Sequence, residues 1–159
     1  MQIYYLEGSA MKNFLNQEIH VNDTVAFIRT KRGMPTSLKT GVVVKVNEKS
    51  ILIDSGGEKY RIMFSTSPSK DQTIMLKVIV LKDREERSDG PKDVTGYPIR
   101  EGDTIAFTED VYQGAVESFI KGTVTGITAQ NVNISSDTER YKKTRRTFNR
   151  IVVINSFQE

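Results

Sequence analysis

The chain has 159 residues, no cysteine, and 23 lysines and arginines against 20 aspartates and glutamates, for a formal net charge of +3. The absence of cysteine excludes disulfide bonds and thiol chemistry, and it fits a cytoplasmic protein. The sequence contains no run of eighteen apolar residues and no charged start followed by an apolar centre, so it predicts neither a membrane span nor a secretory signal.

Residues 1–17 form an N-terminal segment outside the repeated part of the sequence. Its Ile-Tyr-Tyr-Leu run at residues 3–6 is compatible with an added strand. The Gly-Ser-Ala-Met stretch at residues 8–11 is instead similar to a cloning junction, with Met11 as a second possible start. Both interpretations stay open, and no function is assigned to residues 1–10.

An internal repeat is the dominant feature of the sequence. IHVNDTVAF at residues 19–27 returns as IREGDTIAF at residues 99–107, with five of the nine positions identical. After one inserted residue, GVVVKVNEKSILIDS at residues 41–55 matches GTVTGITAQNVNISS at residues 122–136. Because self-similarity at a fixed spacing determines the domain count, the sequence predicts two tandem domains.

The two predicted domains span residues 18–82 and residues 98–159. Near their ends KVIVL at residues 77–81 matches RIVVI at residues 150–154. Each copy consists of short β-branched runs separated by Gly, Asn, Asp and Ser, which indicates strands and turns. About five short, bent strands in roughly 60 residues are typical of a small barrel, so the predicted fold class is all-β.

The apolar spacing within each copy also predicts a local irregularity. Val43 and Val46 are three residues apart, as are Val124 and Ile127. Alternate residues of a strand share a face, so both members of each pair reach the core only if the strand bends or bulges between them. Gly126 is a suitable place for this bend in the second copy.

The two copies differ on what should be the outer face of their strands. The first copy is apolar at three positions where the second is polar, namely Val42, Val44 and Leu52 against Thr123, Thr125 and Asn133. We therefore expect something to cover this face of the first domain.

Residues 83–97 join the two copies and are charged, with glycine and proline among them. This composition favours a solvated linker, although its length also allows it to dock on one barrel. The Arg-Glu-Glu-Arg sequence at residues 84–87 is interpreted as an exposed mixed-charge face, and no site is assigned to it.

Two stretches of the chain are basic and contain no acidic residue. Residues 29–45 carry Arg29, Lys31, Arg32, Lys39 and Lys45. Residues 140–150 carry Arg140, Lys142, Lys143, Arg145, Arg146 and Arg150. Lysines and arginines near phosphates release condensed counterions, so the two stretches together predict a polyanionic partner. The alternative for each is a solvated charged surface.

Tyr141 and Phe148 are interleaved with the cations of the second stretch. Aromatic rings can stack on unpaired bases, so these two residues are candidate base platforms. The alternative is that both belong to the core, since Tyr60 occupies the place of Tyr141 in the first copy and Phe148 directly precedes the last strand.

Catalytic motifs are absent from the sequence. His20 is the one histidine, and it aligns with Arg100, so neither a Ser-His-Asp triad nor a histidine metal cluster can be assembled. No phosphate-binding GxxxxGK[ST] loop or GxGxxG fingerprint occurs. The sequence therefore predicts a protein that is not an enzyme and that needs no cofactor or metal.

The sequences VNDTVAF and EGDTIAF, followed by KTGVVVKV and IKGTVTGI, resemble the KOW and Tudor-like group of SH3-like barrels. Members of that group open with a Gly-Asp-x-Val strand and continue, after a loop, with Lys-Gly-x-x-Gly-x-Val. Gly102, Asp103, Lys121, Gly122 and Gly126 match this pattern. The loop here is longer than in KOW domains, and Lys45 replaces the second glycine in the first copy.

The resemblance implies two tandem SH3-like barrels. KOW proteins bind nucleic acid, ribosomes or RNA polymerase, whereas Tudor proteins hold modified peptides in an aromatic cage, to which Tyr112, Phe119 and Tyr141 would contribute here. The size and tandem architecture are also similar to those of early transcription modifiers of T-even phages, which implies DNA binding in a bacterial cytoplasm or nucleoid.

We therefore expect a non-enzymatic nucleic-acid-binding protein, for DNA rather than RNA, that contacts phosphates with little sequence preference and modulates transcription or nucleoid organisation. The alternative is a protein-interaction module, an adaptor or inhibitor of a host transcription or chromatin factor. In that case the acidic loop TEDVYQGAVESF at residues 108–119 would matter more than residues 140–146.

Overall fold

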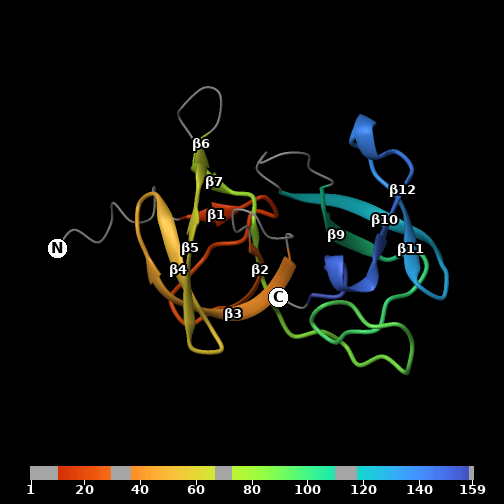
Figure 1. The fold of residues 1–159 in the computed structure, drawn as a ribbon, viewed down its shortest axis with the longest axis horizontal. Helices are drawn as coiled ribbons and strands as arrows, with labels where there is room; N and C mark the ends of the chain where they lie inside the picture. The colour runs from red at the N-terminus through yellow and green to blue at the C-terminus, as the bar shows by residue number, and fades with distance from the viewer. Residues whose placement is uncertain (1–10, 30–36, 67–72, 110–117, 158–159) are drawn as a thin grey trace. The chain divides into compact units, whose positions relative to one another are not determined.

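The computed structural model describes residues 11–29, 37–66, 73–109 and 118–157 (Figure 1). Across these ranges the chain is all-β, as the sequence predicts, and its helical turns are the 3-10 turns η1 (Glu139–Tyr141) and η2 (Phe148–Arg150). Within the described ranges, no helix is both long and apolar enough to cross a membrane.

The first copy contains a five-stranded sheet and a small three-stranded one. The five-stranded sheet has the order β5-β4-β3-β2-β8. Its strands are β2 (Thr24–Arg29), β3 (Ser37–Val46), β4 (Ser50–Ser55), β5 (Glu58–Met63) and β8 (Val78–Val80). The small sheet has the order β1-β7-β6, with β1 (Lys12–Asn13), β6 (Ser65–Thr66) and β7 (Thr73–Met75).

The second copy repeats the five-stranded sheet in the order β12-β11-β10-β9-β13. Its strands are β9 (Thr104–Thr108), β10 (Phe119–Ile127), β11 (Asn131–Ser135), β12 (Thr144–Thr147) and β13 (Ile151–Val153). In both copies four strands follow one another as neighbours and the last strand returns to pair with the first. This is the strand order of an SH3-like barrel, so the predicted fold class is confirmed.

Each copy has its own apolar core. The first is built on Val25, Phe27, Val43, Ile51, Ile53, Val78 and Val80, with Ile19, Ile62, Phe64 and Met75 around them. The second is built on Ile105, Phe107, Val124, Val132, Ile134, Ile151 and Val153, with Ile99 and Tyr141. The alternating apolar positions of the sequence therefore do face the interior.

The predicted irregularity is a β-bulge in both copies. The β3–β4 register shifts between Val43 and Lys45, and the β10–β11 register shifts between Val124 and Gly126. The extra residue turns the strand so that the next apolar side chain again packs against the core, as Val46 and Ile127 do.

The repeat begins earlier in the chain than residues 18 and 98. Residues 12–18 and 92–98 form the same turn, closed by a bridge between Lys12 and Glu18 in one copy and between Lys92 and Pro98 in the other. The turn needs a left-handed residue, which is Asn16 (φ 63°) in the first copy and Gly96 (φ 86°) in the second. This corrects the assignment of residues 12–17 and 92–97 to segments outside the repeat.

The segment between the copies is not a solvated linker, because it packs on the second copy. Arg84 Nη1 lies 3.4 Å from Asp93 Oδ2, and the same nitrogen donates to the Val153 carbonyl at 3.1 Å. Arg87 donates to both oxygens of Asp103, at 2.6 and 2.8 Å. The two arginine side chains are only 10% and 7% exposed, which overturns the expectation of an exposed mixed-charge face.

The electrostatics of the second pair support its structural role. The hydrogen bond to Asp103 raises the pKa of the Arg87 guanidinium above its ordinary value, although burial acts in the opposite direction. The guanidinium also lies 4.9 Å from the centre of the Tyr97 ring. Arg87 is therefore a permanently charged clamp that holds the segment against the barrel.

Replacing Gly122 by alanine is expected to destabilise the second domain by about 1–3 kcal/mol, because an inward methyl group has no room. A Cβ there would lie 2.7 Å from Ile134 Cγ2 and 3.0 Å from Phe107 Cε1. Gly90→Ala is the control, since its Cβ would approach nothing closer than 3.8 Å. Thermal unfolding of both variants tests this, and equal melting temperatures would contradict it.

Candidate nucleic-acid interface

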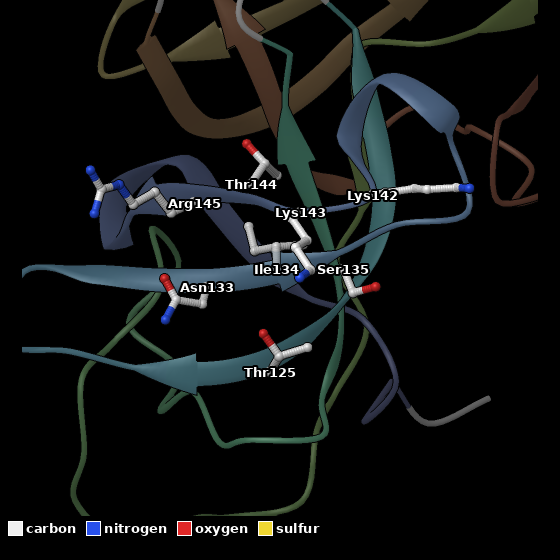
Figure 2. Close-up of a pocket in the computed structure, with 8 residues that line it drawn as sticks. All are labelled: Thr125, Asn133, Ile134, Ser135, Lys142, Lys143, Thr144 and Arg145. Atoms are coloured by element: carbon white, nitrogen blue, oxygen red, sulfur yellow. The ribbon is translucent and has the colours of Figure 1, made fainter.

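A shallow groove of about 810 Å³ lies on the outer face of the second copy (Figure 2). The strands β10, β11 and β12 and the turn before β12 supply its lining residues, which are Thr125, Asn133, Ile134, Ser135, Lys142, Lys143, Thr144 and Arg145. Figure 2 shows Lys143 between Arg145 and Lys142, which extend toward opposite ends of the groove. The described lining residues thus include three cations and no carboxylate.

The turn η1 places the two lysines. Tyr141 closes this turn by donating its amide to the Thr138 carbonyl at 2.8 Å, and its ring meets Phe107 edge-on with 5.8 Å between ring centres. Lys142 and Lys143 directly follow Tyr141 in the chain. Because Tyr141 is fixed in the core, both lysines are positioned at the groove. Lys142 Nζ is paired with Glu139 at 3.0 Å, and both side chains are well exposed.

Strand pairing identifies the matching cations of the first copy. Arg145 lies opposite Asn133 on β11, as Arg61 lies opposite Leu52 on β4. Extending the β11–β12 pairing by one residue places Lys143 opposite Ser135. In the first copy Lys59 lies opposite Asp54 in the same way. In the first copy Asp54 neutralises Lys59 at 3.3 Å, whereas Ser135 carries no charge. The cations are common to both copies, and the carboxylate is not.

The structure divides the second basic stretch into two groups. Lys142, Lys143 and Arg145 line the groove, and Arg140 is exposed with its guanidinium 5.5 Å from the Tyr141 ring centre. Arg146 and Arg150 are instead turned toward β9. The prediction of one surface made by all six cations is therefore wrong for these two.

Arg146 is a core residue with 3% of its surface exposed. Its Nε donates to the Thr108 carbonyl at 2.7 Å, and its Nη1 donates to the Thr144 hydroxyl at 2.7 Å. The guanidinium also lies 5.2 Å from the centre of the Phe107 ring. By strand pairing it occupies the place of the buried Ile62 in the first copy, so it joins strands and is not open to a ligand.

Arg150 is half-buried and has a similar role at the end of β9. Its Nε donates to the Thr108 hydroxyl at 2.6 Å, and its Nη2 donates to the Glu109 carbonyl at 3.0 Å. These bonds hold the residue preceding β13 against the end of β9. Its guanidinium is thus used inside the domain.

The aromatic candidates for base stacking and for a cage differ in burial. Tyr141 is 4% exposed, and Phe148 is a half-buried residue that packs against the second core. Phe119, a candidate for an aromatic cage, is 3% exposed. Burial contradicts stacking by Tyr141 and a cage built on Phe119 and Tyr141, whereas stacking by the half-buried Phe148 stays a prediction. Tyr112 lies outside the described residues.

The first basic stretch is only partly described. Lys31 and Arg32 lie outside the described residues, Arg29 and Lys39 are half-buried, and Lys45 is exposed opposite Leu52. The part of the chain that the structure describes does not gather these residues into a groove like that of the second copy.

Groups suited to catalysis or metal binding are not brought together in the described residues. His20 is exposed and lies 3.4 Å from Glu18. No cluster of three or more His, Cys, Asp or Glu residues that could hold a metal occurs within the described ranges.

The uncharged groove residues Thr125, Asn133 and Ser135 escaped the sequence analysis as site residues. Their side chains are hydrogen-bonding groups on an exposed face. A signal was present, since Thr125 and Asn133 differ in polarity from Val44 and Leu52 at equivalent positions. The same difference is explained equally well by an apolar excess in the first copy.

Comparison with known families adds one match. The model of a family described as "Domain of unknown function (DUF7205)" matches residues 11–78 and again residues 91–154. Both matches begin where the turns at residues 12–18 and 92–98 begin, in agreement with the longer repeat. No curated protein matches the chain.

Proposed function

The chain belongs to the DUF7205 family and carries its domain twice. We propose that it binds nucleic acid, DNA in the first instance, through the groove of its second copy. In this proposal the protein is not an enzyme. Its binding would modulate transcription or nucleoid organisation, for which coating of the DNA backbone is sufficient.

One observation carries the proposal: Lys142, Lys143 and Arg145 lie along one groove whose described lining residues include no carboxylate. Three cations along a groove match the repeated charge of a phosphate backbone. The hydroxyl groups of Thr125 and Ser135 and the amide of Asn133 can donate hydrogen bonds to phosphate oxygens.

The groove chemistry also indicates how specific such binding would be. Contacts to phosphates fix the position of a protein but carry no direct sequence information. Of the described groove residues, Asn133 has the side chain best suited to a base edge, and one amide supplies little discrimination. We expect similar affinities for DNA duplexes of different sequence.

The salt dependence of binding tests the proposal. If Lys143 and Arg145 each neutralise one phosphate of duplex DNA, while Lys142 stays paired with Glu139, the slope of log K against log salt is about −1.8, and affinity falls roughly 12-fold between about 50 and 200 mM salt. The titration compares duplex DNA, single-stranded DNA and RNA by fluorescence anisotropy at both concentrations. A flat response, or no binding at 50 mM, contradicts nucleic-acid binding, and tighter binding of RNA contradicts the choice of DNA.

A further inference from the structure

An exposed apolar strip crosses the outer face of the first copy. Val42 and Val44 on β3 are 39% and 38% exposed, and Met63 on β5 is 55% exposed. Leu52 on β4 is half-buried and lies opposite Arg61, so Met63, two residues farther along β5, is its diagonal neighbour. We refer to Val42, Val44, Leu52 and Met63 as the apolar strip.

The second copy shows that the fold does not require apolar residues at these positions. Strand pairing makes Thr123, Thr125, Asn133 and Thr147 the equivalents of the strip. Two of these equivalents, Thr125 and Asn133, line the groove of the second copy. The same face of one fold is thus apolar in one copy and polar in the other. Exposed apolar groups that the fold does not need are typical of an interaction site.

The charges around the strip indicate the chemistry of its occupant. Leu52 lies between two exposed cations, with Lys45 opposite it on β3 and Arg61 opposite it on β5. The carboxylate on this face, Asp54, is already engaged by Lys59 at 3.3 Å and by the Gly57 amide at 3.0 Å. Among the residues that the structure describes, the strip is therefore flanked by positive charge that its own face does not neutralise.

An apolar strip with cations on both sides does not suit a nucleic-acid backbone. Valine, leucine and methionine side chains offer no donor to a phosphate and no ring on which a base can stack. They do suit apolar side chains of another protein, since burying them removes their surface from water.

We propose that the apolar strip docks a segment of a partner protein whose apolar side chains are flanked by aspartate or glutamate. The apolar side chains cover Val44, Leu52 and Met63, and the carboxylates meet Lys45 and Arg61. Charge complementarity of this kind increases the rate and the specificity of association. The surface is distinct from the groove, so it does not depend on nucleic-acid binding.

Selection from a random library of 12-residue peptides on the immobilised full-length chain tests the proposal. We expect the selected peptides to be rich in acidic and apolar residues. They should lose at least 10-fold in affinity for the variant Val42→Thr, Val44→Thr, Leu52→Asn and Met63→Thr, which has the residues of the second copy. Circular dichroism and DNA affinity are the controls, and both should be unchanged because the second copy tolerates these residues.

A second variant separates charge from apolar contact. Lys45→Gln with Arg61→Gln keeps the strip and should also weaken the acidic peptides about 10-fold. The proposal is overturned if no selected peptide depends on the strip, or if the dependent peptides are basic or uncharged. It is equally overturned if sedimentation shows a dimer that the strip variant abolishes, or if peptides bind only after residues 1–10 are removed.

Discussion

Replacing Lys143 and Arg145 together by alanine is expected to weaken binding to duplex DNA roughly 60-fold at 0.1 M salt. Each groove cation that neutralises a phosphate contributes about 0.9 to the slope of log K against log salt, so the slope should become shallower by about 1.8. Both side chains line the groove and are exposed, so their loss should not affect folding. A titration over several salt concentrations gives both quantities at once.

The first copy supplies a matched control for this result. Lys59 and Arg61 occupy the equivalent positions, but Lys59 is neutralised by Asp54 and Arg61 borders the apolar strip. Replacing these two by alanine should change DNA affinity less than about 2-fold, because no counterion is released there. If the two double variants weaken binding equally, the groove of the second copy is not the DNA site.

The barrel strands were predictable because their apolar residues alternate toward a core. The three-residue spacing from Val43 to Val46 even indicated the bulge, since two side chains three apart cannot otherwise share one face. Comparing the two copies helped further, because most buried strand positions are apolar in both, although the buried Arg146 stands where the first copy has Ile62.

The directions of the basic side chains were not predictable from the charge run alone. Arg145 and Arg146 are neighbours on β12, so their side chains point to opposite faces, one into the groove and one into the core. The η1 turn also misaligns the two copies in this region. Aligning the sequences places Tyr60 with Tyr141, whereas the strand pairing makes Thr144 the equivalent of Tyr60. A three-residue offset separates sequence alignment from structural equivalence.

The packing of residues 83–97 was also hidden from composition. A segment rich in charge, glycine and proline is usually solvated, but its arginines find partners distant in sequence. Asp103, the partner of Arg87, is 16 residues away in the chain. Its equivalent in the first copy, Asp23, accepts a hydrogen bond from the His20 amide and, within the described residues, none from an arginine. The repeat therefore gave no hint of the pair, which is specific to the second copy.

Replacing Asp103 by alanine is expected to lower the free energy of unfolding of the second domain by about 3–5 kcal/mol, since the buried Arg87 loses its counter-charge. Asp103 accepts two bonds from Arg87 and one from the Arg100 amide at 2.8 Å, and its side chain is only 5% exposed. For a domain of this size such a loss corresponds to a fall in melting temperature of at least about 12 °C. Hydrogen exchange resolved by residue assigns the loss to the second copy.

Asp23→Ala tests whether this cost arises from the ion pair or from the turn. Asp23 accepts the His20 amide at 2.8 Å in the same turn of the first copy, so its loss should cost only about 1 kcal/mol. The double variant Arg87→Met with Asp103→Asn removes both charges and keeps an acceptor for Arg100. It should recover most of the stability, because an absent buried pair costs far less than a broken one. If Asp23→Ala is as damaging as Asp103→Ala, or if the double variant recovers nothing, the carboxylate matters for the turn, and the Arg87 clamp does not hold the segment.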